Sequence, residues 1–539
     1  MSPRQPIEKI LARARQAARA RDWITAQEAY QSVLDRFPAN KKAQQGMAAL
    51  RPVAVTELLK SAQVAQSAGK WADAERGLSV AAALAPDLPE VVLALAVCRL
   101  EMGLAPAALS AAEVVLEHLP DHPGAMNAKG RALYMMGHGD ASRACFQAAL
   151  GHAETDAETL NNLGILARAR GERSAAATFF RRALDISPRD AGVHRNLAHV
   201  ITYTEDEPHL AQMRDCLAGL DAADPDVVPL HFALFKALDD LGRYNEAFGH
   251  LVTGNRMNKA ALGYDFKTDA RPYALSKVLF ASPITASVEA SAGAGGGTGA
   301  RPIFVTGLPR TGTTLTERVL ARADGVQPCG ELSVVSSAVS RLLRAIMARE
   351  TKAIRPDDLV GLGADIRAGL AEYTDGRPVM IDKMPLNFRW IGYICAALPE
   401  ARIVHLNRDP MAVAWSLYRH AFNGAGNGFV YDPADIARFM VLHRDLMAHW
   451  RRVCPGRIFD LDYAALVSEP ERTTRALAEA TGLTWSPDWL TPEQGKGQVS
   501  TASSEQVRRP IYRNSDEDWR RYETSLAPLS SALTTAGVI

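Results

Sequence analysis

The chain of 539 residues lacks a charge bias, because 61 Lys and Arg stand against 60 Asp and Glu and leave a formal net charge of +1. This balance argues against a general nucleic-acid-binding protein, so any cationic site must be local. The sequence also lacks a run of about eighteen uncharged apolar residues that would span a membrane. The first ten residues contain no apolar stretch typical of a signal peptide, so we expect a cytoplasmic protein.

Cysteine is scarce and dispersed. The six cysteines form no C-x-x-C pair, which excludes a disulfide framework and a zinc site and leaves reduced thiols as the expectation. The histidines His405, His420, His443 and His449 show no ligand spacing either, so we interpret them as structural and expect no metal. A chain of this length is expected to form about two or three domains.

The N-terminal half repeats with a period of 34 residues. A glycine, a small residue five positions later and a third position, occupied mostly by proline, recur in one register and resemble tetratricopeptide repeats. The glycine serves the turn between two helices, the small residue lets them approach closely, and the proline ends the second helix. We predict an α-solenoid over residues 5–260, with about 14 extra residues between Pro38 and Pro86. The three columns are Gly69, Gly103, Gly137 and Gly171; Ala74, Ala108, Ser142 and Ala176; and Pro86, Pro120, Glu154 and Pro188.

Solenoids of this type present a concave groove to proteins or peptides, so a protein partner in the groove is one expectation. The alternative is that the repeats only support the second domain or mediate self-association. A helix is predicted over Tyr264–Phe280. The uncharged segment 281–300, rich in Gly, Ala and Ser, is predicted to be a flexible linker to a domain over 301–535.

Apolar strands alternate with helical patterns in this C-terminal domain, which indicates an α/β fold with a mainly parallel sheet. Ligands of such folds bind beyond the carboxyl ends of the strands. We therefore expect the site residues to follow the strands. The predicted strands are Ile303–Val305, Val379–Ile381, Ile403–Leu406 and Ile458–Leu461.

The loop from Gly307 to Thr314 has the G-x4-G-x-T spacing of a phosphate-binding Walker loop, between a strand and a helix. Backbone N–H groups and the positive helix end would both point at the anion. Thr313 stands where the Walker lysine belongs, and Arg310 is the only cation inside the loop. The predicted phosphate contacts come from Arg310, Thr311, Gly312, Thr313 and Thr314.

Three further positions carry candidate chemistry. Arg408 after the third strand and Ser416 on the next helix could hold a second phosphate, or Arg408 could form a structural ion pair. Asp382 could be a magnesium ligand, but Lys383 beside it would compete and could instead neutralise a transferred group. Glu331 is a candidate general base, with a helix cap or a surface residue as the alternative.

Together these segments resemble the sulfotransferase superfamily. The closest resemblance is to the bacterial branch that joins tetratricopeptide repeats to a P-loop-like α/β sulfotransferase domain, similar to tyrosylprotein sulfotransferases. The matching segments are Leu308-Pro309-Arg310-Thr311-Gly312-Thr313-Thr314, Cys329-Gly330-Glu331, Asp382-Lys383-Met384-Pro385-Leu386-Asn387, Leu461-Asp462-Tyr463 and Ser503-Ser504-Glu505-Gln506-Val507. Three positions depart from the pattern: Thr311 replaces a serine, Arg509 stands where a lysine is frequent, and His420 stands where an arginine follows the serine.

The resemblance implies 3′-phosphoadenosine 5′-phosphosulfate as the donor, and no metal. It assigns the 5′-phosphosulfate to the loop, the 3′-phosphate to Arg408 and Ser416, and proximity to the nucleotide to Tyr463. Ser503 and Ser504 would help to hold the donor, and Arg509 is counted with the donor-binding residues. The implied mechanism is in-line transfer of the sulfuryl group to a hydroxyl of a protein, a peptide or a glycan, with a protein tyrosine as one candidate. Glu331 would be the base, while Arg310 and Lys383 would stabilise the developing charge.

Two other functions stay open at this point. A P-loop kinase or NTPase would bind ATP with magnesium through Asp382, but it needs a lysine in the loop. A repeat scaffold with an inactive sulfotransferase domain would bind the nucleotide without transferring a group.

Overall fold

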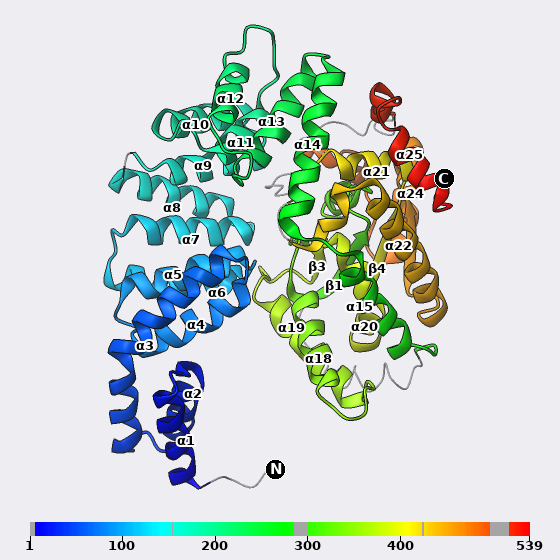
Figure 1. Cartoon of the computed structure of the whole chain (residues 1–539). Coiled ribbons are helices and arrows are strands. Elements are labelled where there is room, and N and C mark those ends of the chain that lie inside the picture. The colour runs from blue at the N-terminus through cyan, green and yellow to red at the C-terminus, as the bar shows by residue number, and fades with distance from the viewer. Residues whose placement is uncertain (1–5, 154, 285–299, 423–424, 496–516) are drawn as a thin grey trace. The chain divides into compact units, whose positions relative to one another are not determined.

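The computed structural model describes residues 6–153, 155–284, 300–422, 425–495 and 517–539 (Figure 1). It divides into two compact units, residues 1–159 and 160–539, which are described separately. The domain bounds 5–260 and 301–535 stay a prediction, and most of the predicted linker 281–300 lies outside the described residues. None of the described helices is both long and apolar enough to cross a membrane.

The first unit consists of helices that pack in consecutive pairs (Figure 1). The turn glycines Gly69, Gly103 and Gly137 have φ values of +68°, +74° and +83°, a region that disfavours other residues. The small residues Ala74, Ala108 and Ser142 are fully buried between the paired helices. The helices are α1 (Ile7–Arg19), α2 (Trp23–Leu34), α3 (Lys41–Ser67), α4 (Trp71–Leu84), α5 (Pro89–Glu101), α6 (Ala105–His118), α7 (Pro123–Met135) and α8 (Gly139–His152).

Helix α3 explains the interruption of the repeat. It has 27 residues, whereas the corresponding first helices α5 and α7 have 13. The difference of 27 − 13 equals the 14 residues by which the spacing from Pro38 to Pro86 exceeds one period. The extra residues therefore lengthen one helix rather than form a loop, and Pro52 is accommodated within it.

The second unit begins with helices of the same repeat pattern, which ends irregularly, as expected. Gly171 and Gly242 again have positive φ values, and Ala176 is fully buried. Helix α15 confirms the helix predicted over Tyr264–Phe280. The helices are α9 (Ala157–Ala169), α10 (Arg173–Ile186), α11 (Ala191–Val200), α12 (His209–Ala218), α13 (Val227–Asp240), α14 (Tyr244–Leu262) and α15 (Phe266–Leu279).

The second unit also contains the predicted parallel sheet. Its five described strands run in the order β2-β3-β1-β4-β5, and every neighbouring pair is parallel. Four strands agree with the prediction, whereas the short edge strand β2 was not foreseen. The strands are β1 (Arg301–Gly307), β2 (Val326–Pro328), β3 (Val379–Asp382), β4 (Arg402–Asn407) and β5 (Ile458–Asp462).

Both faces of the sheet are buried, which explains why its strands are continuous apolar runs. Along β1, Ile303 and Val305 face one core and Phe304 faces the other. The first core includes α17 (Thr313–Leu320), α23 (Tyr463–Ser468), α24 (Pro470–Thr481) and η3 (Pro487–Leu490). The second and larger core includes α18 (Val334–Met347), α19 (Pro356–Ala371), α20 (Ile391–Ala397), α21 (Pro410–Tyr418), α22 (Pro433–Val453) and α25 (Ala527–Thr535).

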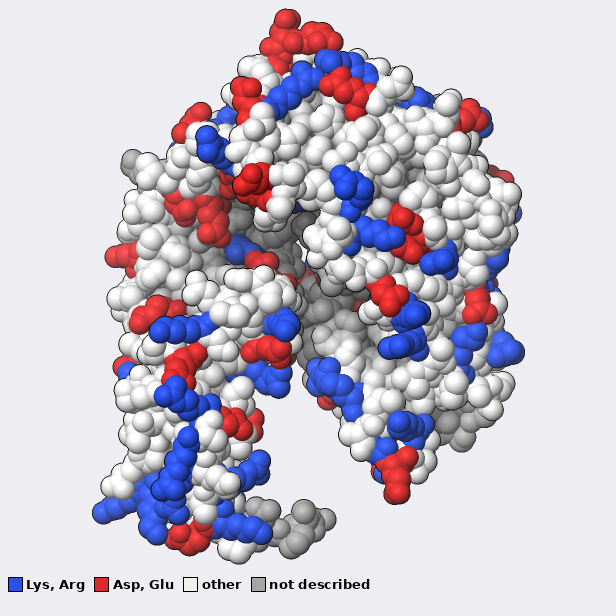
Figure 2. Space-filling model, viewed as in Figure 1, with Lys and Arg blue, Asp and Glu red and all other residues white. Residues whose placement is uncertain are grey.

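The larger core also takes in side chains from the preceding helices. Phe232 and Phe235 of α13, Leu251 of α14 and Tyr273 of α15 are buried in the same cluster as the sheet residues. Shorter 3-10 helices complete the second unit: η1 (Pro385–Trp390), η2 (Ala425–Tyr431), η4 (Pro492–Gln494) and η7 (Asp518–Tyr522). Lysines and arginines are interspersed with acidic side chains over the face shown in Figure 2, in keeping with the small net charge.

Candidate active site

The predicted site residues that the structure describes lie at the edge of the sheet formed by the carboxyl ends of its strands, because all five described strands are parallel. The phosphate loop follows Gly307 at the end of β1, and Lys383 follows Asp382 at the end of β3. Arg408 follows Asn407 of β4, and Tyr463 follows Asp462 of β5. Residues 329–331 follow the end of β2. Five segments that are far apart in the sequence thus converge on a single edge.

The loop between β1 and α17 has the backbone geometry of an anion-binding turn. Arg310 and Gly312 have φ values of +73° and +102°, and Arg310 is only 9% exposed. The hydroxyl of Thr311 donates a hydrogen bond to the Leu308 carbonyl at 2.7 Å, which closes the turn. At Gly307 a Cβ atom would lie 2.8 Å from the Leu406 carbonyl oxygen, so β1 can approach β4 only with glycine here.

The structure brings the first and the second predicted phosphate sites into contact. Arg310 Nε donates to Ser416 Oγ at 2.9 Å, and Arg408 Nη1 donates to the Arg310 carbonyl at 2.9 Å. The Arg408 guanidinium lies 4.4 Å from the centroid of the Tyr463 ring. Gly312 packs so closely on this ring that a Cβ atom would be 2.4 Å from Tyr463 Cδ2. Arg408, Ser416 and Tyr463 therefore lie around a loop that itself carries the guanidinium group of Arg310.

Glu331 and Lys383 form an ion pair next to this loop. Lys383 Nζ lies 2.5 Å from Glu331 Oε1. The lysine side chain is fully buried, whereas the glutamate side chain is 44% exposed. The backbone also joins the two segments, since the N–H of Lys383 donates to the Gly330 carbonyl at 2.8 Å. A solvent-facing carboxylate with a fixed cationic partner can accept a proton from a bound hydroxyl.

Two buried carboxyl groups, Glu317 and Asp382, accompany the pair, and nothing in the sequence indicated a role for Glu317. Glu317 of α17 is 6% exposed and its Oε1 accepts the Gly330 N–H at 2.9 Å. Burial raises the pKa of Glu317 above its usual range, although Lys383 and the Gly330 N–H act in the opposite direction. A glutamate within a helix carries no sequence signal for this contact, because the partner is brought in by the turn after β2.

Asp382 is fully buried, and its hydrogen bonds argue against a role as a magnesium ligand. Its Oδ1 accepts the Leu332 N–H at 3.4 Å and its Oδ2 accepts from Asn387 Nδ2 at 3.0 Å. Burial raises the pKa of Asp382 to about 7 despite these two hydrogen bonds. A carboxyl group held inside the core by backbone and amide donors speaks against the Walker-B interpretation.

His420 stands where the family pattern has an arginine, and both His420 and its neighbour Arg419 hydrogen-bond to groups of the protein. His420 Nδ1 hydrogen-bonds the Ser416 carbonyl at 2.7 Å. Arg419 Nη2 donates to Asp239 Oδ2 of α13 at 3.2 Å. Arg419 therefore does not take the place of the arginine that His420 replaces.

His405 hydrogen-bonds to Asp460 at 2.8 Å and to His443 at 3.0 Å, within the core.

Three predicted site residues lie outside the described residues, namely Ser503, Ser504 and Arg509. Thr313 and Thr314, which end the loop and begin α17, are 4% and 5% exposed. Among the described residues no group of three or more His, Cys, Asp or Glu is arranged to hold a metal ion.

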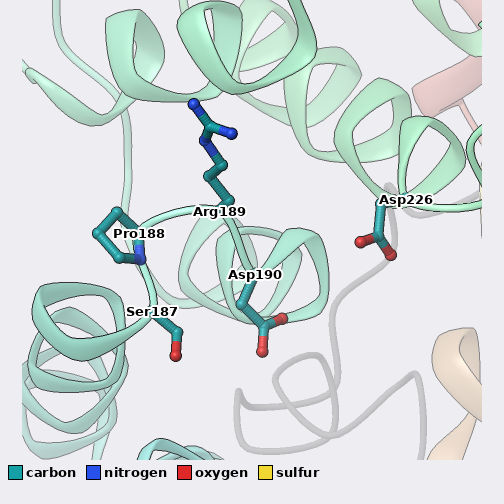
Figure 3. A pocket seen from close by; sticks show the side chains of 5 residues that line it. All are labelled: Ser187, Pro188, Arg189, Asp190 and Asp226. Atoms are coloured by element: carbon teal, nitrogen blue, oxygen red, sulfur yellow. The ribbon is translucent and has the colours of Figure 1, made fainter. Parts of the chain in front are cut away.

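A separate hollow lies among the repeat helices of the second unit and contains none of the predicted site residues. Ser187, Pro188, Arg189, Asp190 and Asp226 line it, and the Arg189 side chain points away from the two carboxylates (Figure 3). Asp190 caps α11 by accepting the Val193 N–H at 2.9 Å. The hollow is thus formed by a helix cap and a turn.

The C-terminal region is similar to a known protein family. Residues 302–487 match the model described as Sulfotransferase family. An uncharacterised protein of Aquifex aeolicus (strain VF5) is 34% identical over 314 residues, which are 56% of this chain and 41% of that protein. Protein-tyrosine sulfotransferase 2 of Gallus gallus is 24% identical over 243 residues, which are 40% of this chain and 62% of that protein. The chain thus covers less than two thirds of either relative.

Among solved structures, the sulfotransferase domain of the Synechococcus PCC 7002 olefin synthase aligns with a TM-score of 0.32 and 19% identity. The alignment covers 45% of this chain and 96% of that domain.

Proposed function

We propose that this chain, whose residues 302–487 match the sulfotransferase family model, transfers a sulfuryl group from 3′-phosphoadenosine 5′-phosphosulfate to a hydroxyl group. The observation that carries the proposal is the convergence of Arg310, Arg408 and Ser416 on one loop, with the Glu331–Lys383 pair beside it. A phosphate loop alone would support only anion binding. A second cationic group and a solvent-facing carboxylate at the same sheet edge support group transfer.

The residues present fit a donor that is phosphorylated at both ends. The turn from Arg310 to Gly312 and the start of α17 would hold the 5′-phosphosulfate, since positive φ values there present backbone N–H groups to an anion. Arg408 and Ser416 would hold the 3′-phosphate by charged and hydroxyl hydrogen bonds. Tyr463, already covered by the Arg408 guanidinium on one side, would border the nucleotide. Ser503, Ser504 and Arg509 are added to this set by the resemblance alone.

The donor supplies an activated sulfuryl group that passes to the acceptor oxygen as its bond to the phosphate oxygen breaks. Glu331 takes the proton of the acceptor hydroxyl, because its side chain is accessible and is paired with Lys383, which follows the strand β3 beside β1. Lys383 and Arg310 stabilise the negative charge that develops on the sulfuryl and phosphate oxygens. The burial of Lys383 makes this charge stabilisation stronger than it would be in water.

The acceptor is proposed to be a hydroxyl of a protein, a peptide or a glycan. Similarity to a protein named for tyrosine sulfation favours a tyrosine. The helical repeats would then provide a surface for a protein partner, as extended repeat surfaces do.

Calorimetry with 3′-phosphoadenosine 5′-phosphate tests the donor. We expect binding by the wild type, and at least about tenfold weaker binding by Arg408→Ala, because a hydrogen bond to a charged group contributes about 1.5–3 kcal/mol. Arg402→Ala is the matched control, since Arg402 begins the same strand at the opposite edge of the sheet. Absence of binding by the wild type would end the proposal.

Transfer itself is tested by incubating the protein with labelled donor and fractions of the native cell lysate, with mass spectrometry of the product. Magnesium-dependent ATP binding that is indifferent to a 3′-phosphate would instead favour a kinase or NTPase. Nucleotide binding without transfer to any fraction would favour a repeat scaffold with an inactive domain.

A further inference from the structure

Glu317 is a buried carboxyl group for which the proposed reaction has no use. It lies on α17, the helix whose first residues form the end of the phosphate loop. Its neighbour Arg318 is directed to the carbonyls of Pro492 and Gly495, at 2.9 and 2.7 Å. A carboxyl group at 6% exposure is costly unless it is hydrogen-bonded or paired, so its contacts indicate what it contributes.

The principal contact of Glu317 is with the backbone just before Glu331. Glu317 Oε1 accepts the Gly330 N–H at 2.9 Å. The carbonyl of the same glycine accepts the Lys383 N–H at 2.8 Å. Gly330 has a φ value of +68°, so the chain turns sharply here into Glu331. Both backbone groups of Gly330 are thus held, one by the loop helix and the other by the end of β3.

This clamp sets the position of Glu331. Because Glu331 is 44% exposed, little packing would otherwise fix its backbone relative to the buried Lys383. With Gly330 held on both sides, Glu331 Oε1 lies 2.5 Å from Lys383 Nζ.

We infer that Glu317 is a positioning residue: it connects the phosphate-loop helix to the Gly330–Glu331 turn and so holds the base beside the loop. The inference rests on the proposed function for the role of Glu331. The connection is short, since Glu317 is about one helical turn from Thr313 at the start of α17. A chain of direct contacts therefore joins the donor loop to the base.

Amide hydrogen exchange on the unliganded protein tests the clamp without an acceptor. Glu317→Ala removes the acceptor of the Gly330 N–H, so we expect exchange in the 329–332 segment to rise at least about tenfold. Glu317→Gln keeps a carbonyl oxygen at the same place, so protection is expected to stay within about threefold of wild type. Unchanged exchange in Glu317→Ala, or equal loss in both variants, would overturn the inference.

Catalysis is measured with the labelled donor and phenol as the hydroxyl probe. We expect kcat to fall about 10- to 100-fold in Glu317→Ala, because small misplacements of catalytic groups have effects of this size. The Kd for 3′-phosphoadenosine 5′-phosphate is expected to stay within about twofold, and Glu317→Gln is expected to recover most of kcat. Val319→Ala shortens a fully buried side chain on the same helix, and so serves as the control for a loss of stability without loss of the clamp. A wild-type kcat in Glu317→Ala would refute the positioning role.

A second variant, Gly330→Ala, changes the Gly330–Glu331 turn itself. Gly330→Ala adds a Cβ that meets no atom within 4 Å, so its effect comes from the positive φ alone. Gly456→Ala is the matched control, because Gly456 has a φ of +71° and equally open surroundings. We expect Gly330→Ala to lower kcat as Glu317→Ala does, and Gly456→Ala to leave it unchanged. Failure of the wild type to bind the nucleotide would count against the proposed function, whereas equal kcat in these two glycine variants would count against the clamp.

Discussion

Replacing Asp382 by asparagine should make the stability of the second unit less dependent on pH. Asp382 ends β3, is fully buried, and has a pKa that burial raises to about 7 from its ordinary value of 3.8. In the unfolded chain the same group loses its proton near its ordinary pKa. The folded protein therefore binds more protons than the unfolded chain between these two values, and stability falls as the pH rises through this window.

The size of the effect follows from the width of the window. Each pH unit within it changes the free energy of unfolding by about 1.4 kcal/mol, so Asp382 removes about 3 kcal/mol between pH 5 and pH 8. In Asp382→Asn the amide imitates the protonated acid. Asn387 Oδ1 is a buried atom without a hydrogen-bond partner among the described residues, and a flip of that amide would let it accept from the new Nδ2. The substitution should therefore be tolerated.

The assay compares urea-unfolding midpoints of the wild type and the variant from pH 5 to pH 8. We expect the stability of Asp382→Asn relative to wild type to rise by about 3 kcal/mol over this range. Asp460→Asn is the opposite control: although burial alone would raise the pKa of Asp460, hydrogen bonds from Arg451 and His405 hold it well below its usual range. Its contribution is present above its unfolded pKa and is lost only in acid, so its difference from wild type stays flat from pH 5 to pH 8. An equally flat difference for Asp382→Asn would refute the reasoning.

Three further substitutions have expected outcomes. Gly312→Ala places a Cβ 2.4 Å from Tyr463 at a φ of +102°. We expect it to weaken binding of 3′-phosphoadenosine 5′-phosphate at least about tenfold in calorimetry. Gly376→Ala, at a φ of +92° with no atom within 4 Å, is the control and should leave binding unchanged. Lys383→Ala leaves Glu317 and Asp382 buried without their cation, and should lower the free energy of unfolding measured in urea by about 2 kcal/mol. This value is reduced because Glu331 is 44% exposed. Gly164→Ala places a Cβ 2.4 Å from the Phe180 ring and should destabilise the protein by about 1–3 kcal/mol in thermal unfolding, while Gly249→Ala, with no atom within 4 Å, should be neutral or stabilising.

The repeats and the sheet could be predicted because their signals are local. Gly69, Gly103 and Gly137 recur because every pair of helices needs the same turn, and all three have positive φ. The apolar strands were recognised because a parallel sheet is buried on both faces. Strand β2 was missed, since its three residues, one of them a proline, show no such run. Helix α19 was missed as well, although Pro356 at its start and two aspartates in its first turn are the usual signals.

The site was predictable as a set of segments and not as a set of contacts. Arg310 and Ser416 were assigned to different phosphates, yet Arg310 Nε donates to Ser416 Oγ over a separation of 106 residues. The contact depends on the register of β1 with β4, which places Gly307 opposite Leu406. Glu317 gave no signal at all, because its partner Gly330 is positioned by the turn after β2. Motifs identify chemistry, whereas the pairing of strands decides which residues meet.

The helices just before residue 281 help to position the site. They belong to the same compact unit as the sheet, residues 160–539. Asp239 of α13 is buried and accepts hydrogen bonds from Arg419 Nη2 at 3.2 Å and from Tyr522 OH at 2.7 Å. Asn255 of α14 donates to the Tyr418 carbonyl at 2.9 Å. Both contacts fall at the end of α21, two or three residues after Ser416, and Figure 1 shows α14 running alongside this part of the fold. Helix α21 is thus held by Arg310 on the side of the phosphate loop and by α13 and α14 at its end. Because the same helices share the large core with the sheet, the position of Ser416 depends on residues that precede the first strand by more than forty positions.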